Sequence, residues 1–191
     1  MLGGELAIRI LVVSDTHGDF ESWKKLREQS GVVDQIVHLG DFLYHGPRNP
    51  IPTGYDPLAL AEALKSENLM AVRGNCDADV DLMLLGIEDM AKFMILTFGK
   101  YKMVCLHGEN IKSDEDLIQL LKNYEACIVA FGHTHIPRLE KKEAGVILNP
   151  GSPSLPKKNN PPSFALIDFD NEYLKISLFT LSGKLVAEVN L

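Results

Sequence analysis

The sequence contains few cysteines and no long apolar run, and both scarcities narrow the class of protein. The three cysteines, Cys76, Cys105 and Cys127, form no CxxC pair. An odd number without paired spacing argues against a disulfide framework and indicates reduced thiols. No stretch approaches the ~18 apolar residues of a membrane span. Because Glu5 is acidic and Arg9 interrupts the apolar run around it, the first residues fit a strand better than a signal peptide, and we expect a cytoplasmic protein.

Basic residues are also fewer than acidic ones. Lys and Arg number 19 against 26 Asp and Glu, which gives a formal net charge of −7. A long nucleic acid or an anionic membrane is therefore a poor candidate for a partner. The 191 residues, of which 46% are hydrophobic and 24% charged, suffice for one sizeable core, and no linker, repeat or low-complexity tail divides them. We expect a single domain over 1–191.

The order of the predicted elements indicates an α/β fold. Short apolar runs predict strands, and amphipathic segments predict helices. The strands are expected at 7–14, 35–41, 69–75, 93–98, 101–107, 126–132, 136–140, 145–149, 163–168, 172–181 and 184–190, and the helices at 19–31, 58–68 and 113–125. This order predicts a four-layer α-β-β-α sandwich of two mixed sheets with flanking helices. Residues 42–57, with four prolines and two glycines, predict a long ordered loop with a functional role.

Polar side chains gather immediately after the predicted strands. They are Asp15, His17, Asp41, Asn75, His107, His133 and His135. In open α/β sheets ligands bind outside the carboxyl ends of strands, so these side chains are expected to share one crevice. Imidazole, carboxylate and carboxamide groups suit divalent ions of the Mn, Fe, Zn or Mg class. Two ions ~3.5–4 Å apart would need a shared ligand, for which a lone Asp is the natural choice, and would form a clamp for phosphate esters.

Five short motifs occur in an order that is similar to a known family. SDTHG, GD, GNCD, HG and GHTH resemble the signature of the calcineurin-like metallophosphoesterases. The segments HGPRNPIPTGYDP, VRGNCD and NPGSPSLPKKNNPPS resemble one branch of that superfamily, the small bacterial phosphodiesterases of the YfcE type. The resemblance covers about residues 10–165. It implies hydrolysis of small phosphodiesters.

The resemblance also implies a role for each residue of the set. Asp15, His17, Asp41 and His135 would hold one metal ion, and Asp41, Asn75, His107 and His133 a second, with Asp41 bridging. Mn²⁺ is the expected ion, with Ni²⁺, Co²⁺, Fe²⁺, Zn²⁺ or Mg²⁺ as alternatives. A bridging water or hydroxide would be the nucleophile. Two divalent ions, the two Asp ligands and this hydroxide leave a net charge of about +1, which suits a singly charged diester.

The sequence departs from the superfamily at Cys76, where most members have a histidine that is thought to assist the leaving oxygen. The resemblance makes Asp41, Asn75 and Cys76 the candidate catalytic residues. A neutral thiol is a weak donor and carries no positive charge. We therefore expect good turnover of diesters with acidic leaving groups, such as nitrophenyl esters, and slow turnover of alkyl diesters and monoesters.

Several other residues allow both a functional and a structural interpretation. His45 and Arg48 could contact a substrate phosphate or only pack the loop, and Asn149 could orient a ligand histidine or only form a turn. Arg73 is expected to be structural, although it could pair with a carboxylate. Structural roles are expected for His38, for Asp19 as a helix cap, and for Cys105 and Cys127 in the core.

Two other functions compete with small-molecule hydrolysis. A catalytically weak metal-binding scaffold, or a protein-interaction subunit of the same fold, would use its surface to hold partners. A nuclease would need a longer basic surface than this acidic chain offers. The apolar stretch VDLMLLGIEDM could face a neighbouring copy in a homo-oligomer. The complete set of seven ligands favours catalysis.

Overall fold

Two mixed sheets form the centre of the molecule in the computed structural model, which describes residues 8–170 and 173–191. The first sheet has the order β11-β10-β9-β1-β2-β3. Its strands are β1 (Ile8–Val13), β2 (Gln35–His38), β3 (Leu69–Ala71), β9 (Ser163–Phe169), β10 (Leu174–Thr180) and β11 (Leu185–Asn190). The three strands β1, β2 and β3 are parallel, so their carboxyl ends lie at one edge of the sheet.

The second sheet has the order β4-β5-β6-β8-β7. Its strands are β4 (Phe93–Phe98), β5 (Tyr101–Leu106), β6 (Ile128–Phe131), β7 (Arg138–Lys142) and β8 (Gly145–Asn149). The central strands β5, β6 and β8 are parallel, and the outer strands β4 and β7 are antiparallel to their neighbours. The β4–β5 hairpin turns at Gly99-Lys100, where the sequence predicts it.

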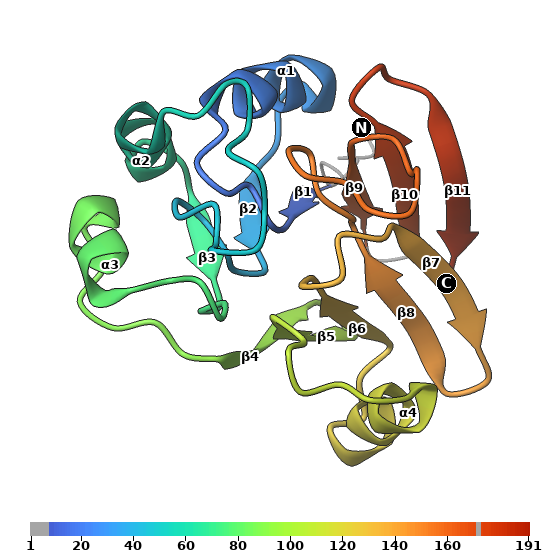
Figure 1. The fold of residues 1–191 in the computed structure, drawn as a ribbon. Coiled ribbons are helices and arrows are strands. Elements are labelled where there is room, and N and C mark those ends of the chain that lie inside the picture. Colours follow the sequence, from blue (N-terminus) through green and yellow to red (C-terminus); the bar gives the residue numbers. More distant parts are fainter. Residues whose placement is uncertain (1–7, 171–172) are drawn as a thin grey trace, which may run out of the picture.

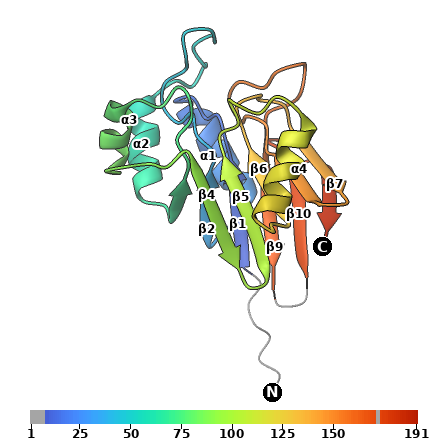
Figure 2. The same cartoon turned by 90° about the horizontal axis from the view of Figure 1, so that it is seen from below.

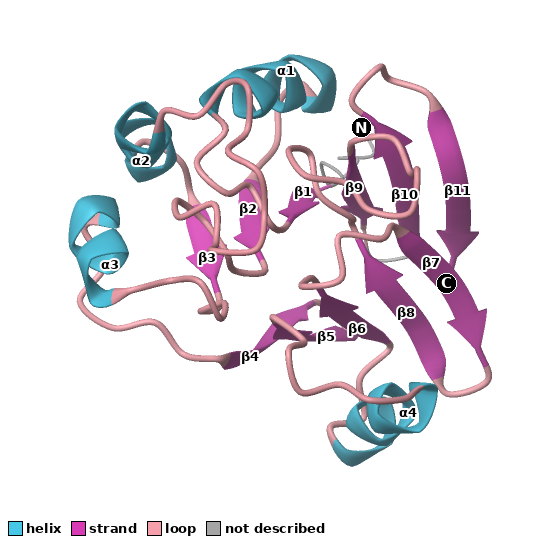
Figure 3. Ribbon diagram, in the orientation of Figure 1, coloured by secondary structure: helices cyan, strands magenta, loops and turns pink. Residues whose placement is uncertain are grey.

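Four helices of the described residues cover the outer faces of the two sheets (Figures 1 and 3). They are α1 (Phe20–Ser30), α2 (Pro57–Lys65), α3 (Asp79–Leu85) and α4 (Asp114–Asn123). One apolar cluster fills the space between the sheets, a second joins the first sheet to α1, α2 and α3, and a third joins the second sheet to α4. In Figure 1, α1 lies at the top and α4 at the bottom of the molecule, and in Figure 2, which is seen from below, α4 is at the front with α1 behind it. The four-layer α-β-β-α sandwich is therefore confirmed.

Local sequence signals account for the ends of the predicted helices. The Asp19 side chain accepts a hydrogen bond from the backbone N–H of Ser22 at 3.0 Å and so caps α1, as expected. Gly31 ends this helix with φ of 66°, a conformation that glycine adopts without a steric penalty. At α4 the Asp116 carboxylate accepts the backbone N–H of Ser113 at 3.0 Å.

Apart from shorter ends, such as β2 ending at His38 rather than at 41 and α2 at Lys65 rather than at 68, the structure differs from the predicted elements in three places. Helix α3 was not predicted, because Ala78 precedes it without an oxygen-bearing cap and its signal comes mainly from Gly86, which ends it with φ of 71°. Strand β3 ends at Ala71, four residues early, and β7 begins at Arg138 rather than Ile136, after a proline that has no N–H to donate. Residue 172, the predicted start of a strand, lies outside the described residues. Among the residues that are described, no helix has the length and apolar character needed to cross a bilayer.

Candidate metal centre

The carboxyl ends of five parallel strands, three from one sheet and two from the other, carry the predicted ligand residues. Asp15 and His17 follow β1, Asp41 follows β2, Asn75 follows β3, His107 follows β5, and His133 and His135 follow β6. Both sheets therefore contribute, and the site lies where their edges meet. The prediction that separate strand ends supply one crevice matches this placement.

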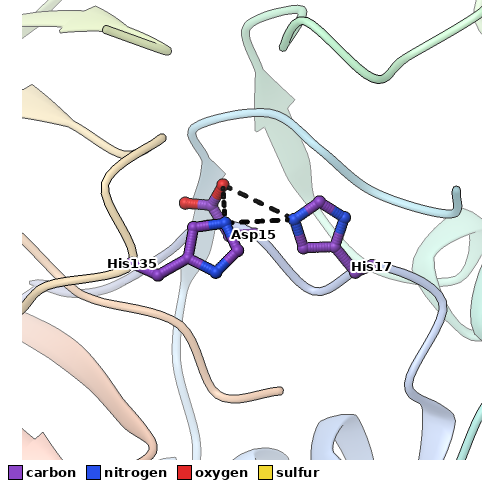
Figure 4. Close-up of side chains that lie close together, drawn as sticks. All are labelled: Asp15, His17 and His135. Carbon is purple, nitrogen blue, oxygen red and sulfur yellow. Dashed lines mark hydrogen bonds and ion pairs between the residues drawn. The ribbon is translucent and has the colours of Figure 1, made fainter. Parts of the chain in front are cut away.

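Asp15, His17 and His135 form the first group of facing ligand atoms (Figure 4). The Nε2 atoms of His17 and His135 lie 3.2 Å apart. Asp15 Oδ1 lies 3.8 Å from Nε2 of His17 and 3.3 Å from Nε2 of His135. All three side chains are buried. The close-up shows the carboxylate and both imidazole edges pointing at one another.

Backbone carbonyls fix which nitrogen of each imidazole carries the proton. His17 Nδ1 lies 2.7 Å from the carbonyl oxygen of Tyr44, and His135 Nδ1 lies 2.6 Å from that of Leu155. A carbonyl oxygen only accepts hydrogen bonds, so each Nδ1 carries a hydrogen and donates it. In the neutral imidazoles both Nε2 atoms then present lone pairs. Partners of this kind hold metal-binding histidines in orientation.

Asp41, Asn75 and His107 form the second group. His107 Nε2 lies 3.4 Å from Asp41 Oδ2 and 3.1 Å from Asn75 Oδ1. His107 Nδ1 donates to the carbonyl oxygen of Leu39 at 2.7 Å, so its Nε2 also faces the oxygens. The ring of His133 packs edge-on against that of His107, with 5.2 Å between centroids.

Asp41 lies between the two groups. Its Oδ2 atom is 3.7 Å from His17 Nε2 in the first group and 3.4 Å from His107 Nε2 in the second. Its other oxygen, Oδ1, accepts the backbone N–H of Cys76 at 2.8 Å. One carboxylate oxygen is thus tied to the backbone while the other faces both groups, which is the arrangement expected of a shared ligand.

The donor atoms at this site fit cations better than they fit one another. Asp15 Oδ1 is buried and accepts no hydrogen bond from the described residues. The lone pairs of His17 and His135 point at each other and at this oxygen. Facing lone pairs in a buried site repel unless a proton or a cation lies between them. Nitrogen and oxygen donors in this number match the preferences of first-row divalent metals.

Most of the predicted ligand residues have an uncommon backbone conformation. Positive φ angles occur at Asp15 (56°), His17 (46°), Asp41 (59°), His133 (63°) and His135 (57°). Such angles cost roughly 1–3 kcal/mol each and cluster at functional sites. They turn the chain sharply after each strand, and the side chains consequently point inward rather than along the strand.

Burial and mutual charge set the protonation states of the site. Burial disfavours the charged forms of Asp15 and Asp41, but the neighbouring histidines outweigh it, and the pKa of each carboxyl lies below its usual value. Burial also opposes the charge on His107, yet its hydrogen bond to Asp41 and the two carboxylates raise its pKa to about 9. Burial lowers the pKa of His17. The carboxylates are thus ionised, and a cation would replace the proton on His107.

Glycines precede several of these residues because the backbones approach one another closely. The φ of Gly132, the residue before His133, is outside the left-handed region, so its backbone conformation does not require glycine. A Cβ atom there would collide with the Oγ of Ser14 and come within 2.8 Å of Asp15 Oδ2. The requirement at this position is space beside a ligand residue.

Three polar side chains hold the backbone around the candidate centre in place, a role that the sequence alone did not reveal. Ser152 Oγ donates to the backbone oxygen of Asp15 at 2.8 Å. Asn149 Nδ2 donates to the carbonyl oxygen of Gly132 at 2.8 Å, so Asn149 holds the backbone next to His133 rather than a histidine ring. The Asp77 carboxylate accepts three backbone N–H groups, from Asp41, Phe42 and Gly74. The NPGS and GNCD segments were the only sequence signals for them.

His38 and Arg73 have structural contacts, as predicted. His38 is buried, and its Nδ1 accepts the N–H of Gly40 while Nε2 donates to Thr16 Oγ1. Arg73 forms an ion pair with Asp79 at 2.8 Å. Cys105 is buried between the sheets, and Cys127 packs against the same cluster.

A cavity of about 540 Å³ opens over the candidate centre. Its wall includes Asp41, Asn75 and His133, together with Cys76 and part of the 42–56 loop. Cys76 Sγ accepts a hydrogen bond from Asn75 Nδ2 at 3.2 Å. Burial, followed by the charge of Asp41, raises the pKa of this thiol to about 12, so the thiol is neutral at neutral pH.

Comparisons by family model, by sequence and by structure all identify phosphoesterases as similar proteins. The family model of the calcineurin-like phosphoesterase superfamily domain matches residues 8–172. Phosphodiesterase YfcE of Escherichia coli K12 is 38% identical over 168 residues, which cover 85% of this chain and 89% of that protein. The solved structure of the E. coli phosphoesterase YfcE superposes with a TM-score of 0.79 at 34% identity, covering 95% of this chain and 98% of the other.

A more distant structure shares the fold alone. Vacuolar protein sorting 29 from Cryptosporidium parvum superposes with a TM-score of 0.73 at 20% identity, over 98% of this chain and 99% of the other. The motif order, the two-sheet fold and the family match agree with one another. The chain belongs to the calcineurin-like phosphoesterase superfamily, as its motifs predict.

Proposed function

We propose that this protein hydrolyses small phosphodiesters at a centre of two divalent metal ions, with Mn²⁺ as the first ion to test. The observation that carries the proposal is the position of Asp41 Oδ2, between His17 Nε2 of one group and His107 Nε2 of the other. The phosphodiesterase name of the 38% identical E. coli relative supports the same reaction class.

The chain's own residues would divide the work between binding and orientation. Asp15, His17 and His135 would hold one ion, and Asn75, His107 and His133 the other, with Asp41 shared. The carbonyls of Tyr44, Leu39 and Leu155 keep the imidazole lone pairs aimed at the ions. The ions, when bound, would stabilise charge on the phosphoryl oxygens and acidify the attacking water.

Cys76 would limit the range of leaving groups. Its neutral thiol lines the cavity beside Asn75 but is a weak hydrogen-bond donor. A leaving oxygen that needs a proton would gain little from it, and an acidic phenol would need none. Nitrophenyl diesters are therefore the substrates with which activity should be sought first.

A metal-reconstitution experiment tests the proposal. Protein stripped with a chelator should not hydrolyse bis(4-nitrophenyl) phosphate, and a divalent ion should restore turnover. Asp41→Asn should lower kcat by more than ~100-fold, because it weakens the ligand that both ions would share. Asp79→Asn, an exposed carboxylate outside the cavity, is the matched control. Failure of Mn²⁺, Ni²⁺, Co²⁺, Fe²⁺, Zn²⁺ and Mg²⁺ alike to give activity would overturn the proposal.

That negative outcome would favour a binding scaffold. Helix α3 leaves Val80 60% and Met83 79% exposed, and exposed apolar side chains of this size suit a contact with another protein. The complete set of donor atoms argues for catalysis as the primary function.

A further inference from the structure

The two cationic side chains that line the metal-site cavity have no carboxylate partner within the described residues. They are Arg48, on the 42–56 loop, and Lys157, on the 150–162 segment after β8. The other arginines all pair with an acidic side chain: Arg9, Arg27, Arg73 and Arg138. Arg48 is exposed and differs from all of them. Unpaired cations gathered in one cavity of an acidic protein indicate an anionic ligand.

The segments that carry the two cations are those that orient the ligand histidines. The Tyr44 carbonyl accepts His17 Nδ1, and four residues later the chain reaches Arg48. A turn closed by the N–H of Asn49 to the carbonyl of Gly46, at 3.3 Å, holds Arg48 between these two residues. The side chain of Asn49 also donates to the carbonyl of His45 at 2.8 Å. Arg48 is therefore placed by a structured turn.

Lys157 has an equivalent connection to the other histidine of the first group. The Leu155 carbonyl accepts His135 Nδ1 at 2.6 Å, and the N–H of Lys157 donates to the backbone oxygen of His135 at 3.2 Å. The side chain of Asn160 donates to the Lys157 carbonyl at 2.8 Å. Two backbone contacts thus hold Lys157 in register with a ligand residue.

Charge selects the kind of ligand. A two-ion centre with its two carboxylates and nucleophile carries a net charge of about +1, which a simple diester balances. Arg48 and Lys157 add two positive charges that such a diester leaves unmatched. A phosphate monoester elsewhere on the substrate carries a charge of about −1.5 to −2 at neutral pH and would match them.

We propose that Arg48 and Lys157 bind a second, terminal phosphate on the substrate, so that the preferred substrates are phosphodiesters that also carry a phosphate monoester. This inference rests on the proposed hydrolysis and names its substrate class. A bidentate guanidinium and a mobile ammonium are a common pair for phosphate recognition. The second phosphate would be bound and not cleaved.

Two thymidine esters with the same leaving group test the inference. Thymidine 5′-(4-nitrophenyl phosphate) carries only the diester, and its 3′-phosphorylated form adds the monoester. Wild-type protein should have a kcat/KM at least ~10-fold higher for the 3′-phosphorylated form, equal to ~1.4 kcal/mol. Arg48→Ala with Lys157→Ala should remove this preference and leave bis(4-nitrophenyl) phosphate within about threefold of wild type. Arg48→Lys with Lys157→Arg should retain part of it.

A binding measurement makes the test independent of turnover. Thymidine 3′,5′-bisphosphate should bind the metal-loaded wild type at least ~10-fold more tightly than thymidine 5′-phosphate, and the double alanine variant should lose that difference. Raising the salt from about 0.05 to about 0.5 M should shrink the difference in wild type, because exposed cations are screened. Lys100→Ala, in the β4–β5 turn, is the control and should behave as wild type.

The outcomes separate this inference from the proposed function. Hydrolysis of bis(4-nitrophenyl) phosphate with no preference for the 3′-phosphorylated ester would overturn the substrate class and leave the hydrolysis standing. An equal preference in the double alanine variant would overturn the assignment to Arg48 and Lys157. The absence of any metal-dependent hydrolysis would overturn the proposed function itself.

Discussion

His17 Nε2 lies 3.2 Å from His135 Nε2, although 118 residues separate the two histidines in the chain. Each Nδ1 is occupied by a carbonyl oxygen, so the two facing nitrogens have lone pairs and no hydrogen to share when neutral. The fold thus brings two repelling groups together and holds them there. A cation between them removes the repulsion, and metal binding should consequently stabilise the fold.

Metal removal and His135→Ala test this relationship. At an ion concentration of 100 times Kd, a divalent ion should stabilise the wild type by about 2.7 kcal/mol per site, seen as a higher Tm. His135→Ala should remove part of that gain and reduce the bound metal from two ions to one, measured by elemental analysis after dialysis. An unchanged metal content in His135→Ala would contradict the assignment of this residue as a ligand.

The stability of the metal-free protein should depend on pH through His38. Burial lowers the pKa of this imidazole to about 3, against 6.5 in an exposed histidine. Since the unfolded chain binds the proton more readily, His38 contributes its full stability above about pH 6.5 and loses it as the pH falls toward about 3. Relative to His38→Gln, wild type should lose about 2–3 kcal/mol between about pH 7.5 and about pH 4.5.

Urea unfolding of both proteins at the two pH values measures this difference. His38→Gln is the useful comparison because glutamine can keep the donor to Thr16 Oγ1 while it does not titrate. Other titrating groups are common to both proteins and cancel in the comparison. Parallel pH profiles for the two proteins would show that His38 is not the group responsible.

Most members of the superfamily have a histidine at the position of Cys76. Cys76→Ser and Cys76→His test whether lack of space under the 42–56 loop or only the loss of a proton donor distinguishes this protein from them. A Cβ on Gly46 would lie only 3.1 Å from Cys76 Sγ, so the 42–56 loop packs closely over the thiol. Serine fits that space and should hydrolyse bis(4-nitrophenyl) phosphate within about threefold of wild type. The larger imidazole should displace the loop, raise KM and give no gain with alkyl diesters. If Cys76→His instead hydrolysed alkyl diesters ~10-fold faster or more, the histidine would fit, and the thiol would limit only proton donation to the leaving oxygen.

The convergence of the ligand residues could be predicted from the sequence because it follows from the strands. Asp15, Asp41 and His107 each come directly after an apolar run, and parallel strands place their carboxyl ends together. Burial of both faces of those strands made the runs easy to recognise. The same reasoning predicted two mixed sheets and three of the four helices found in the described residues.

The partners of the histidines could not be predicted in this way. The carbonyls of Tyr44 and Leu39 lie 27 and 68 residues from the imidazoles that they orient, and every residue type has a carbonyl. No residue type in the sequence therefore marks such a contact. Helix α3 was not predicted for a related reason. Asp81 caps it by accepting a hydrogen bond from the N–H of Ala78, and Ala78 has no capping side chain of its own.

The Asp77 carboxylate should control metal affinity without touching the metal. It is buried and accepts the N–H groups of Asp41, Phe42 and Gly74 at 2.9, 2.8 and 2.7 Å, so it ties the loop after β2 to the loop after β3. Asp77→Asn turns one acceptor into an NH₂ group that faces an N–H, at a cost of about 1–3 kcal/mol. The loops that place Asp41 and Asn75 should then separate. Metal affinity should fall by roughly 10–100-fold, the range seen when partners of ligand residues are removed.

Titration calorimetry with Mn²⁺ on Asp77→Asn, beside Asp79→Asn, measures this effect. Asp79 is two residues away and its side chain is 90% exposed, so its substitution changes the same charge and removes only an exposed ion pair with Arg73, which contributes little to stability. A drop in affinity for Asp77→Asn alone would identify the carboxylate as the tie between the two loops. Equal losses in both variants would point to net charge near the cavity as the cause, and no loss in either would show that the two loops hold their positions without it.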